Sequence, residues 1–159
     1  ALQIPTLAIC PAIDPAVTMH AIDAGWAGYR WYFIRKWHRA LRAKQQAFPD
    51  RYDFSPALQL RSVSALTDLF VRYHTDYAHT ADYVSRYTLT GTALKNTEAT
   101  IILAQDDPII PLHSFAGLPN DVRVVASPWG GHCGFLDTAR GPTWADQAAV
   151  TFFRQALSG

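Results

Sequence analysis

The sequence has few charged residues and very little cysteine. Charged side chains make up 17% of the 159 residues, against about 25% in an average soluble domain. Two cysteines are too few for the disulfide framework of a small secreted protein. The formal net charge is only +1, so the chain has no overall electric field that would attract a nucleic acid. We therefore expect no nucleic-acid partner.

Long hydrophobic runs are also absent. No stretch approaches the about 18 consecutive apolar residues that a transmembrane helix requires. The N-terminus has no basic segment followed by an apolar run, as a secretory signal would have. We therefore expect a cytoplasmic protein with no transmembrane segment. Aromatic residues, in contrast, make up 13% of the chain, and with so few charges this is typical of a domain with a face that something else covers.

Three short apolar runs predict buried β-strands, and helical patterns separate them. The runs cover residues 6–10, 99–105 and 122–126. Because they are apolar throughout, they are typical of parallel strands covered on both faces, and the fold class is α/β. Residues 11–98 lie between the first two strands, whereas a simple crossover needs only about a dozen residues. We therefore predict that 11–98 form a helical cap inserted between two adjacent strands of one sheet.

Capping residues and apolar spacing predict where the helices lie. Asp14 and Pro15 are suited to begin a helix that Gly25 ends. The pair Ser55-Pro56 is suited to begin another. Thr143 begins the last helix in a capping-box pattern. The segments with helical apolar spacing cover 26–48, 66–77, 80–87 and 143–157.

The helix predicted over 26–48 has two contrasting faces. Its apolar stripe consists of Trp26, Tyr29, Phe33, Trp37 and Leu41. The helix has no acidic residue, and its basic residues are Arg30, Arg35, Lys36, Arg39, Arg42 and Lys44. A basic amphipathic helix can lie on a membrane surface or bind a partner, although such a face is more often simply solvated. A non-catalytic remnant or an interaction module that uses 26–48 is therefore the alternative to an enzyme.

Two residues expected after neighbouring strands have the chemistry of a catalytic pair. Asp107 comes directly after the strand at 99–105, and His132 lies in a glycine-rich loop after the strand at 122–126. In open parallel sheets, active sites lie beyond the carboxyl ends of the strands. An aspartate that orients a histidine, whose other nitrogen acts as general base, forms two thirds of a nucleophilic triad. We expect Asp107 and His132 to be catalytic.

Two other arrangements use the same loops. Cys133 could be a nucleophile beside His132, although adjacent residues rarely reach hydrogen-bond geometry with each other. A divalent metal site is the other, because side chains of suitable types lie at Asp106, Asp107, His113 and His132. No His-Glu-x-x-His motif or cysteine pairing supports it, so we expect no metal and no cofactor.

The same two loops resemble the acid and histidine motifs of the α/β-hydrolase superfamily. The motifs are Asp106-Asp107-Pro108 and Gly130-Gly131-His132-Cys133-Gly134-Phe135. Within this superfamily the chain is most similar to the YheT-type family of predicted esterases. Two further stretches, 10–15 and 48–54, also resemble bacterial members of that family. The resemblance implies that Asp107 is the triad acid, with Asp106 ranked second, and that His132 is the general base.

One element that this family requires is missing from the sequence. The nucleophile elbow has the pattern Gly-x-Ser-x-Gly, and no serine of the chain lies in one. The resemblance therefore implies that 1–159 are the C-terminal portion of an α/β-hydrolase domain, with about three parallel strands of a doubly wound sheet. We expect the N-terminal half, on the same or a second chain, to be a partner. The whole enzyme is expected to hydrolyse carboxylic esters, small-molecule and lipid-like, and this chain alone to be inactive.

Overall fold

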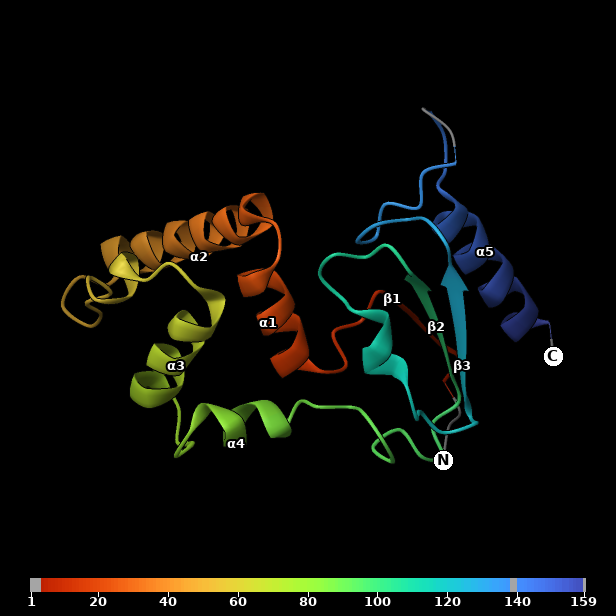
Figure 1. Cartoon of the computed structure of the whole chain (residues 1–159), viewed down its shortest axis with the longest axis horizontal. Helices are drawn as coiled ribbons and strands as arrows, with labels where there is room; N and C mark the ends of the chain where they lie inside the picture. Colours follow the sequence, from red (N-terminus) through yellow and green to blue (C-terminus); the bar gives the residue numbers. More distant parts are fainter. Residues whose placement is uncertain (1–3, 138–139, 159) are drawn as a thin grey trace. The chain divides into compact units, whose positions relative to one another are not determined.

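The computed structural model describes residues 4–137 and 140–158 (Figure 1). The chain divides into two compact units. The sheet unit comprises Ala1–Thr18 and Thr88–Gly159, and the helical unit comprises Met19–Tyr87. The helical unit therefore lies within the segment 11–98, where the sequence predicts an inserted helical cap.

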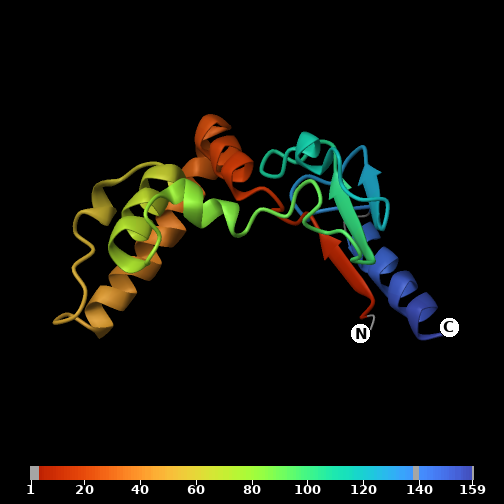
Figure 2. The same cartoon turned by 90° about the horizontal axis from the view of Figure 1, so that it is seen from below.

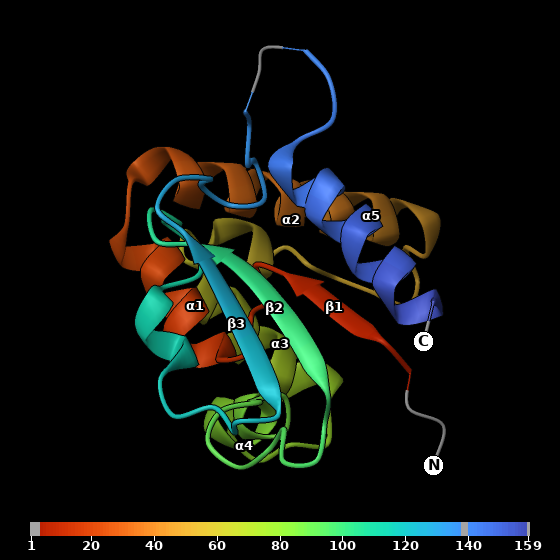
Figure 3. The same cartoon turned by 90° about the vertical axis from the view of Figure 1, so that its right-hand side faces the viewer.

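Three parallel strands form the sheet, in the order β1-β2-β3 (Figure 3). They are β1 (Thr6–Ile9), β2 (Ala99–Ala104) and β3 (Val122–Ser127). The first residue of β2 lies opposite the first residue of each neighbour, so the three strands start in register. Each strand is within one residue of its predicted bounds, and the predicted α/β class with a parallel sheet is confirmed.

Burial is concentrated in the central strand. The side chains of β2 from Ile101 to Ala104 are at most 3% exposed. The outer strands are more open, and Ile9 of β1 and Val124 of β3 are exposed. Because β2 has a hydrogen-bonded neighbour on each side, the ends of β2 and β3 are fixed relative to each other, which positions the loops that follow them.

The last helix, α5 (Trp144–Leu157), packs against β1. Thr143 and Asp146 form the capping box that the sequence predicts, since each side chain accepts a hydrogen bond from the other residue's backbone N–H. Most apolar side chains of α5 are exposed or only half-buried. Ala145 is its one buried residue, and Leu157 is 85% exposed. The reason is that α5 faces an edge strand, so most of its length has no sheet to cover it.

The helical unit is built from α-helices in succession along the chain (Figure 2). Helix α1 (Pro15–Ala24) begins in the sheet unit, where the Asp14 carboxylate accepts a hydrogen bond from the Val17 N–H, as its predicted capping role requires. The later elements are α2 (Ala27–Ala47), the 3₁₀ helix η1 (Ala57–Gln59), α3 (Val63–His74) and α4 (Thr80–Ser85). Helix α3 packs on both α2 and α4.

A partly buried hydrogen-bond network ties the start of α3 to the end of α1. The Asp23 carboxylate accepts hydrogen bonds from the N–H groups of Val63 and Ser64, at 2.7 and 2.9 Å, and from the Ser64 hydroxyl at 2.7 Å. Ser62 also caps α3 by accepting a hydrogen bond from the Ala65 N–H. A carboxylate at a helix N-terminus satisfies free N–H groups and is favoured by the helix dipole.

One prediction in the helical unit is wrong. The Ser55-Pro56 pair is followed only by the three-residue η1, because the α-helix starts later, where Ser62 and Asp23 supply caps.

The predicted apolar stripe of α2 is covered only in part. Trp26 is 72% exposed, and the other four stripe residues are half-buried. The fully buried residues of α2 are Ile34 and His38, which lie beside the stripe.

Candidate active site

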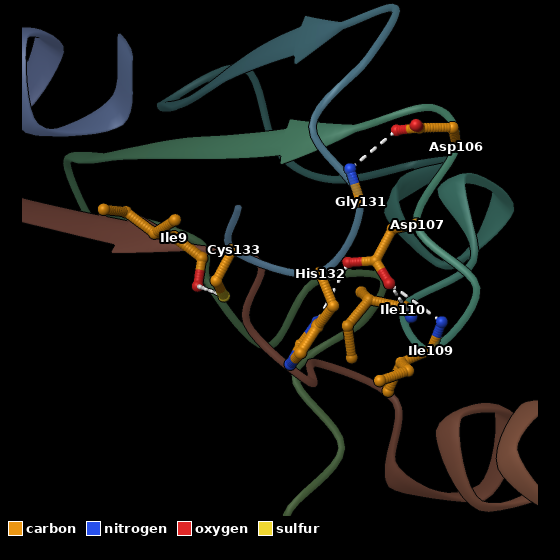
Figure 4. Close-up of polar contacts among 8 residues, drawn as sticks. All are labelled: Ile9, Asp106, Asp107, Ile109, Ile110, Gly131, His132 and Cys133. Atoms are coloured by element: carbon orange, nitrogen blue, oxygen red, sulfur yellow. Dashed lines mark hydrogen bonds and ion pairs between the residues drawn. The ribbon is translucent and has the colours of Figure 1, made fainter. Parts of the chain in front are cut away.

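Two loops at the carboxyl edge of the sheet place Asp107 and His132 side by side (Figure 4). Asp107 lies three residues after the end of β2, and His132 lies five residues after the end of β3. Strands β2 and β3 are parallel neighbours, so both loops leave the sheet at the same edge. The His132 Nδ1 lies 3.0 Å from the Asp107 Oδ2, which is a hydrogen bond. The two residues that the sequence predicts for the site therefore meet.

Asp107 is held from both sides. Its Oδ1 accepts hydrogen bonds from the backbone N–H groups of Ile109 and Ile110, at 2.8 and 3.0 Å, while Oδ2 faces His132. Its side chain is 1% exposed, whereas the His132 side chain is 33% exposed. A buried carboxylate with three partners has little freedom to move. The arrangement fixes one side of the imidazole and leaves the other accessible.

The neighbouring Asp106 holds the histidine loop. Its Oδ1 accepts a hydrogen bond of 2.9 Å from the backbone N–H of Gly131, the residue before His132 (Figure 4). Two consecutive aspartates after β2 thus bind the loop after β3 in different ways. Asp107 contacts the imidazole and Asp106 contacts the backbone. The sequence ranks Asp106 as the second choice of triad acid, and the structure gives it this loop contact.

Gly130 is required by close packing under the same loop. A Cβ atom at this position would lie 2.5 Å from the Phe135 ring and 3.0 Å from the Ala104 Cβ. Phe135 is 3% exposed, so it has no room to move aside. The glycine thus lets the loop fold back over Phe135 at the end of β2, and this close fold presents His132 at the sheet edge.

Both cysteines of the chain lie beside His132. The thiols of Cys10 and Cys133 and one imidazole nitrogen lie within 4.8 Å of one another. Cys10 follows β1, is buried, and has a left-handed backbone with φ of 44°. Cys133 is exposed, with φ of 64°. Non-glycine residues in this conformation are uncommon and are found most often at functional sites.

Burial raises the pKa of Cys10 to about 12. The nearby Cys133 and Asp107 add to the rise by Coulomb repulsion of the thiolate. A thiol with such a pKa stays protonated at neutral pH and is a poor nucleophile. In the metal-free protein Cys10 is therefore a buried neutral group at the edge of the site.

The metal site considered from the sequence does not form as a group. Within the described residues, the set with metal-ligand geometry is Cys10, His132 and Cys133, and it includes neither aspartate nor His113. Sequence reasoning missed Cys10 as a neighbour of His132. The signal was its position just after a strand, which puts it at the same sheet edge as the other two loops.

Several serine hydroxyls donate to backbone carbonyls, whereas the Ser114 Oγ is buried and has no hydrogen-bond partner among the described residues. Ser127, for example, donates to the backbone carbonyl of Trp129, and Ser158 to that of Arg154. Among residues 4–137 and 140–158, no hydrogen bond joins a serine to His132. The accessible side of the imidazole therefore has no hydroxyl nucleophile from the described part of this chain.

Comparisons with known proteins leave the family open. No family model, no curated protein and no solved structure matches this chain. Within the described residues, none of the helices combines the length and the apolar character needed to cross a membrane.

Proposed function

We propose that this chain is the C-terminal part of a serine hydrolase that acts on carboxylic esters, and that Asp107 and His132 are its triad acid and base. The observation that carries the proposal is the 3.0 Å contact between the His132 Nδ1 and a buried carboxylate, with the imidazole itself a third exposed. General-base catalysis requires this orientation of the imidazole, because the aspartate fixes one nitrogen and leaves the other facing the substrate.

In the proposed mechanism, the Asp107 carboxylate accepts a hydrogen bond from the His132 Nδ1–H. The other ring nitrogen, Nε2, therefore carries a lone pair. Nε2 takes the proton of a serine hydroxyl while the serine oxygen bonds to the ester carbonyl carbon. The imidazolium returns that proton to the alcohol oxygen as the ester bond breaks, which leaves an acyl-serine. A water molecule then bonds to the acyl carbon as the same Nε2 takes its proton, and the imidazolium returns that proton to the serine oxygen as the acid leaves. The serine and the oxyanion donors come from the half that this chain does not supply.

The edge strand β1 supports a partner at this end of the sheet. In the order β1-β2-β3, one side of β1 has no strand partner among the described residues, and Ile9 is 36% exposed. Unpaired strand edges bind further strands readily. The exposed side of α5 adds a second apolar surface in the same unit, with Phe153 45% exposed. The missing N-terminal strands would pair with β1 and cover this surface.

A lipid-like ester is the substrate class that we favour. The helical unit exposes large aromatic side chains, among them Trp26, Trp31, Tyr32, Phe48 and Tyr73. Exposed aromatic groups of this kind are common where a protein binds apolar ligands. These side chains therefore offer an apolar surface of the kind that binds acyl chains.

The test searches for the missing nucleophile. The proposal expects a Gly-x-Ser-x-Gly elbow either upstream in the same reading frame or in a neighbouring gene. The two halves are produced together and treated with a fluorophosphonate probe, which should label that serine. His132→Ala should abolish labelling, and His113→Ala should leave it unchanged. Absence of an elbow, labelling that persists in His132→Ala, or labelling of the 159-residue chain alone would each contradict the proposal.

A second candidate function rests on the two thiols beside His132. Two cysteines and a histidine are a known zinc ligand set with one position open for water or substrate. In that case His132 would bind zinc through Nε2, and Asp107 would orient it from Nδ1 as carboxylates often do for metal-bound histidines. The three ligand atoms lie within 4.8 Å of one another, and zinc would bind them with bonds of about 2.3 Å to sulfur and about 2.0 Å to nitrogen.

Metal content separates the two candidates. The zinc hypothesis expects one zinc ion per purified chain, measured by mass spectrometry, and its loss in Cys10→Ser and Cys133→Ser. The serine hydrolase hypothesis expects no stoichiometric metal. It also expects the two halves to keep their fluorophosphonate labelling when either cysteine is changed to serine.

A further inference from the structure

The helical unit contains an open cleft lined by arginines. The cleft has a volume of about 720 Å³, and its walls come from α2 and from the segment before α3. Its basic lining residues are Arg35, Arg39, Arg42 and Arg61, and the remaining lining residues include Trp31, Ile34 and His38. A cleft of this size accommodates a small organic molecule.

The four guanidinium groups have no carboxylate partner. Among the described residues, no Asp or Glu oxygen lies within ion-pair distance of any of them. Arg61 donates only to the backbone carbonyls of Leu58 and Leu60, at 3.1 and 3.2 Å. The Arg35 guanidinium lies over the Trp31 ring, 5.1 Å from its centroid. Most of the donor capacity of these arginines is therefore unused by the protein.

His38 also lines the cleft and is only 5% exposed. Its Nε2 is buried and has no hydrogen-bond partner in the described structure. Burial lowers the pKa of His38, and the positive charges of Arg61 and Arg42 lower it further, while the backbone at Ala57 and Leu60 acts in the opposite direction. The positive charge of the cleft therefore comes from its arginines.

The geometry points to a binding site for an organic phosphate monoester in this cleft. Guanidinium groups bind phosphate oxygens through paired hydrogen bonds, and a dianion would offset part of the repulsion among four like charges. Trp31 and Ile34 supply an aromatic and an apolar surface for the organic part of the ligand. The site lies entirely in the helical unit and does not depend on Asp107 or His132.

The binding test uses phenyl phosphate as a probe and isothermal titration calorimetry as the readout. We expect saturable binding to the full chain, and much weaker binding of phenol, which lacks the phosphate. Arg42→Ala and Arg61→Ala should each weaken binding by about tenfold or more, as expected for a lost charge-assisted contact.

Arg72→Ala is the matched control, because Arg72 is an exposed arginine of the same unit outside the cleft. It should leave phenyl phosphate binding unchanged, and so should Asp107→Asn. The latter result separates this inference from the proposed hydrolase function, which Asp107→Asn would disable. No saturable binding to the wild-type chain, equal binding of phenol, or equal weakening by Arg72→Ala would overturn the inference.

A second arm identifies the source of the phosphate. Sedimentation with phosphatidylcholine vesicles is compared with and without phosphatidic acid, whose headgroup is a phosphate monoester. Sedimentation that needs phosphatidic acid and is lost in Arg42→Ala assigns the ligand to a lipid headgroup. Binding of phenyl phosphate without sedimentation assigns it to a soluble ester. Sedimentation that Arg42→Ala and Arg61→Ala do not alter indicates general attraction to an anionic surface and overturns the inference.

Discussion

The two units of this chain differ in formal charge and in how their buried polar groups are hydrogen-bonded. The sheet unit has four basic and seven acidic residues, and the helical unit has ten basic and six acidic residues. Their formal charges, −3 and +4, nearly cancel in the net charge of +1. In the sheet unit Asp107 has three hydrogen-bond partners. In the helical unit the buried His38 Nε2 has none.

The sheet unit has polar groups bonded in advance, as catalysis requires. The helical unit has unbonded donors, as ligand binding requires. A catalytic histidine must be held in one orientation before substrate arrives, so its supporting groups are already bonded in the free protein. A ligand site gains affinity when its donors are unbonded in the free protein and become bonded in the complex. The predictions below test the contrast, from the largest effect to the smallest.

Asp107→Asn should have the largest effect. It tests the proposed role of Asp107 as the triad acid. In the assembled hydrolase the amide should favour the wrong imidazole tautomer and lower kcat by about 10⁴-fold, with little change in KM. Steady-state kinetics on an activated ester measures both constants. Asp121→Asn is the control, because Asp121 is exposed and contacts only the loop at Asn96. Similar losses in both variants would contradict the assigned role.

Gly130→Ala should destabilise the sheet unit by about 3 kcal/mol, since the new methyl group would overlap the buried Phe135 ring. Gly131→Ala is the matched comparison. Gly131 has a left-handed φ of 53° but open space around it, so alanine there should cost only about 1 kcal/mol. Urea unfolding followed by tryptophan fluorescence measures both. An equal loss in the two variants would show that packing under the loop is not what selects Gly130.

Asp106→Ala should lower kcat of the assembled enzyme by about tenfold, because the histidine loop loses its bond at Gly131. Asp106→Asn keeps an oxygen acceptor in the same place and should restore most of the rate. The pH profile should keep its shape in both variants, since Asp106 acts on loop position and does not touch the imidazole. No rescue by asparagine would mean that the charge of Asp106, and not its hydrogen bond, is required.

Ser62→Ala should have the smallest effect, about 1 kcal/mol, as expected for a lost helix N-cap. It tests whether the helical unit depends on α3 being capped at this residue. Ser85→Ala in the same unit is the control, because the Ser85 hydroxyl bonds only the carbonyl of Asp82. Thermal unfolding followed by circular dichroism should show a lower Tm for Ser62→Ala alone.

Much of the sheet unit could be predicted from the sequence because its signals are local. Apolar runs fixed the strands to within a residue, and the Thr143 capping box was visible as a motif. The pairing of Asp107 with His132 followed from one topological rule, that parallel neighbours end at the same sheet edge. Nothing more than strand order was required to bring those two residues together.

The parts that escaped prediction depend on contacts between distant residues. The start of α3 depends on Asp23, a carboxylate 40 residues earlier in the chain, so the local Ser55-Pro56 signal was misleading. His38 is buried because η1 and α3 pack on α2, which periodicity within α2 cannot show. Cys10 reaches His132 only through the pairing of β1 with β2. Such contacts follow from tertiary structure and leave no pattern in a short window of sequence.

The most direct test of the central claim is the tautomer of His132, measured in this chain by long-range ¹H–¹⁵N NMR of the neutral imidazole. The account predicts a proton on Nδ1, bonded to Asp107, and a bare Nε2 that can accept a proton. Asp107→Asn should remove this preference. A wild-type ring with its proton on Nε2 would contradict the account, because that nitrogen could not then act as the base.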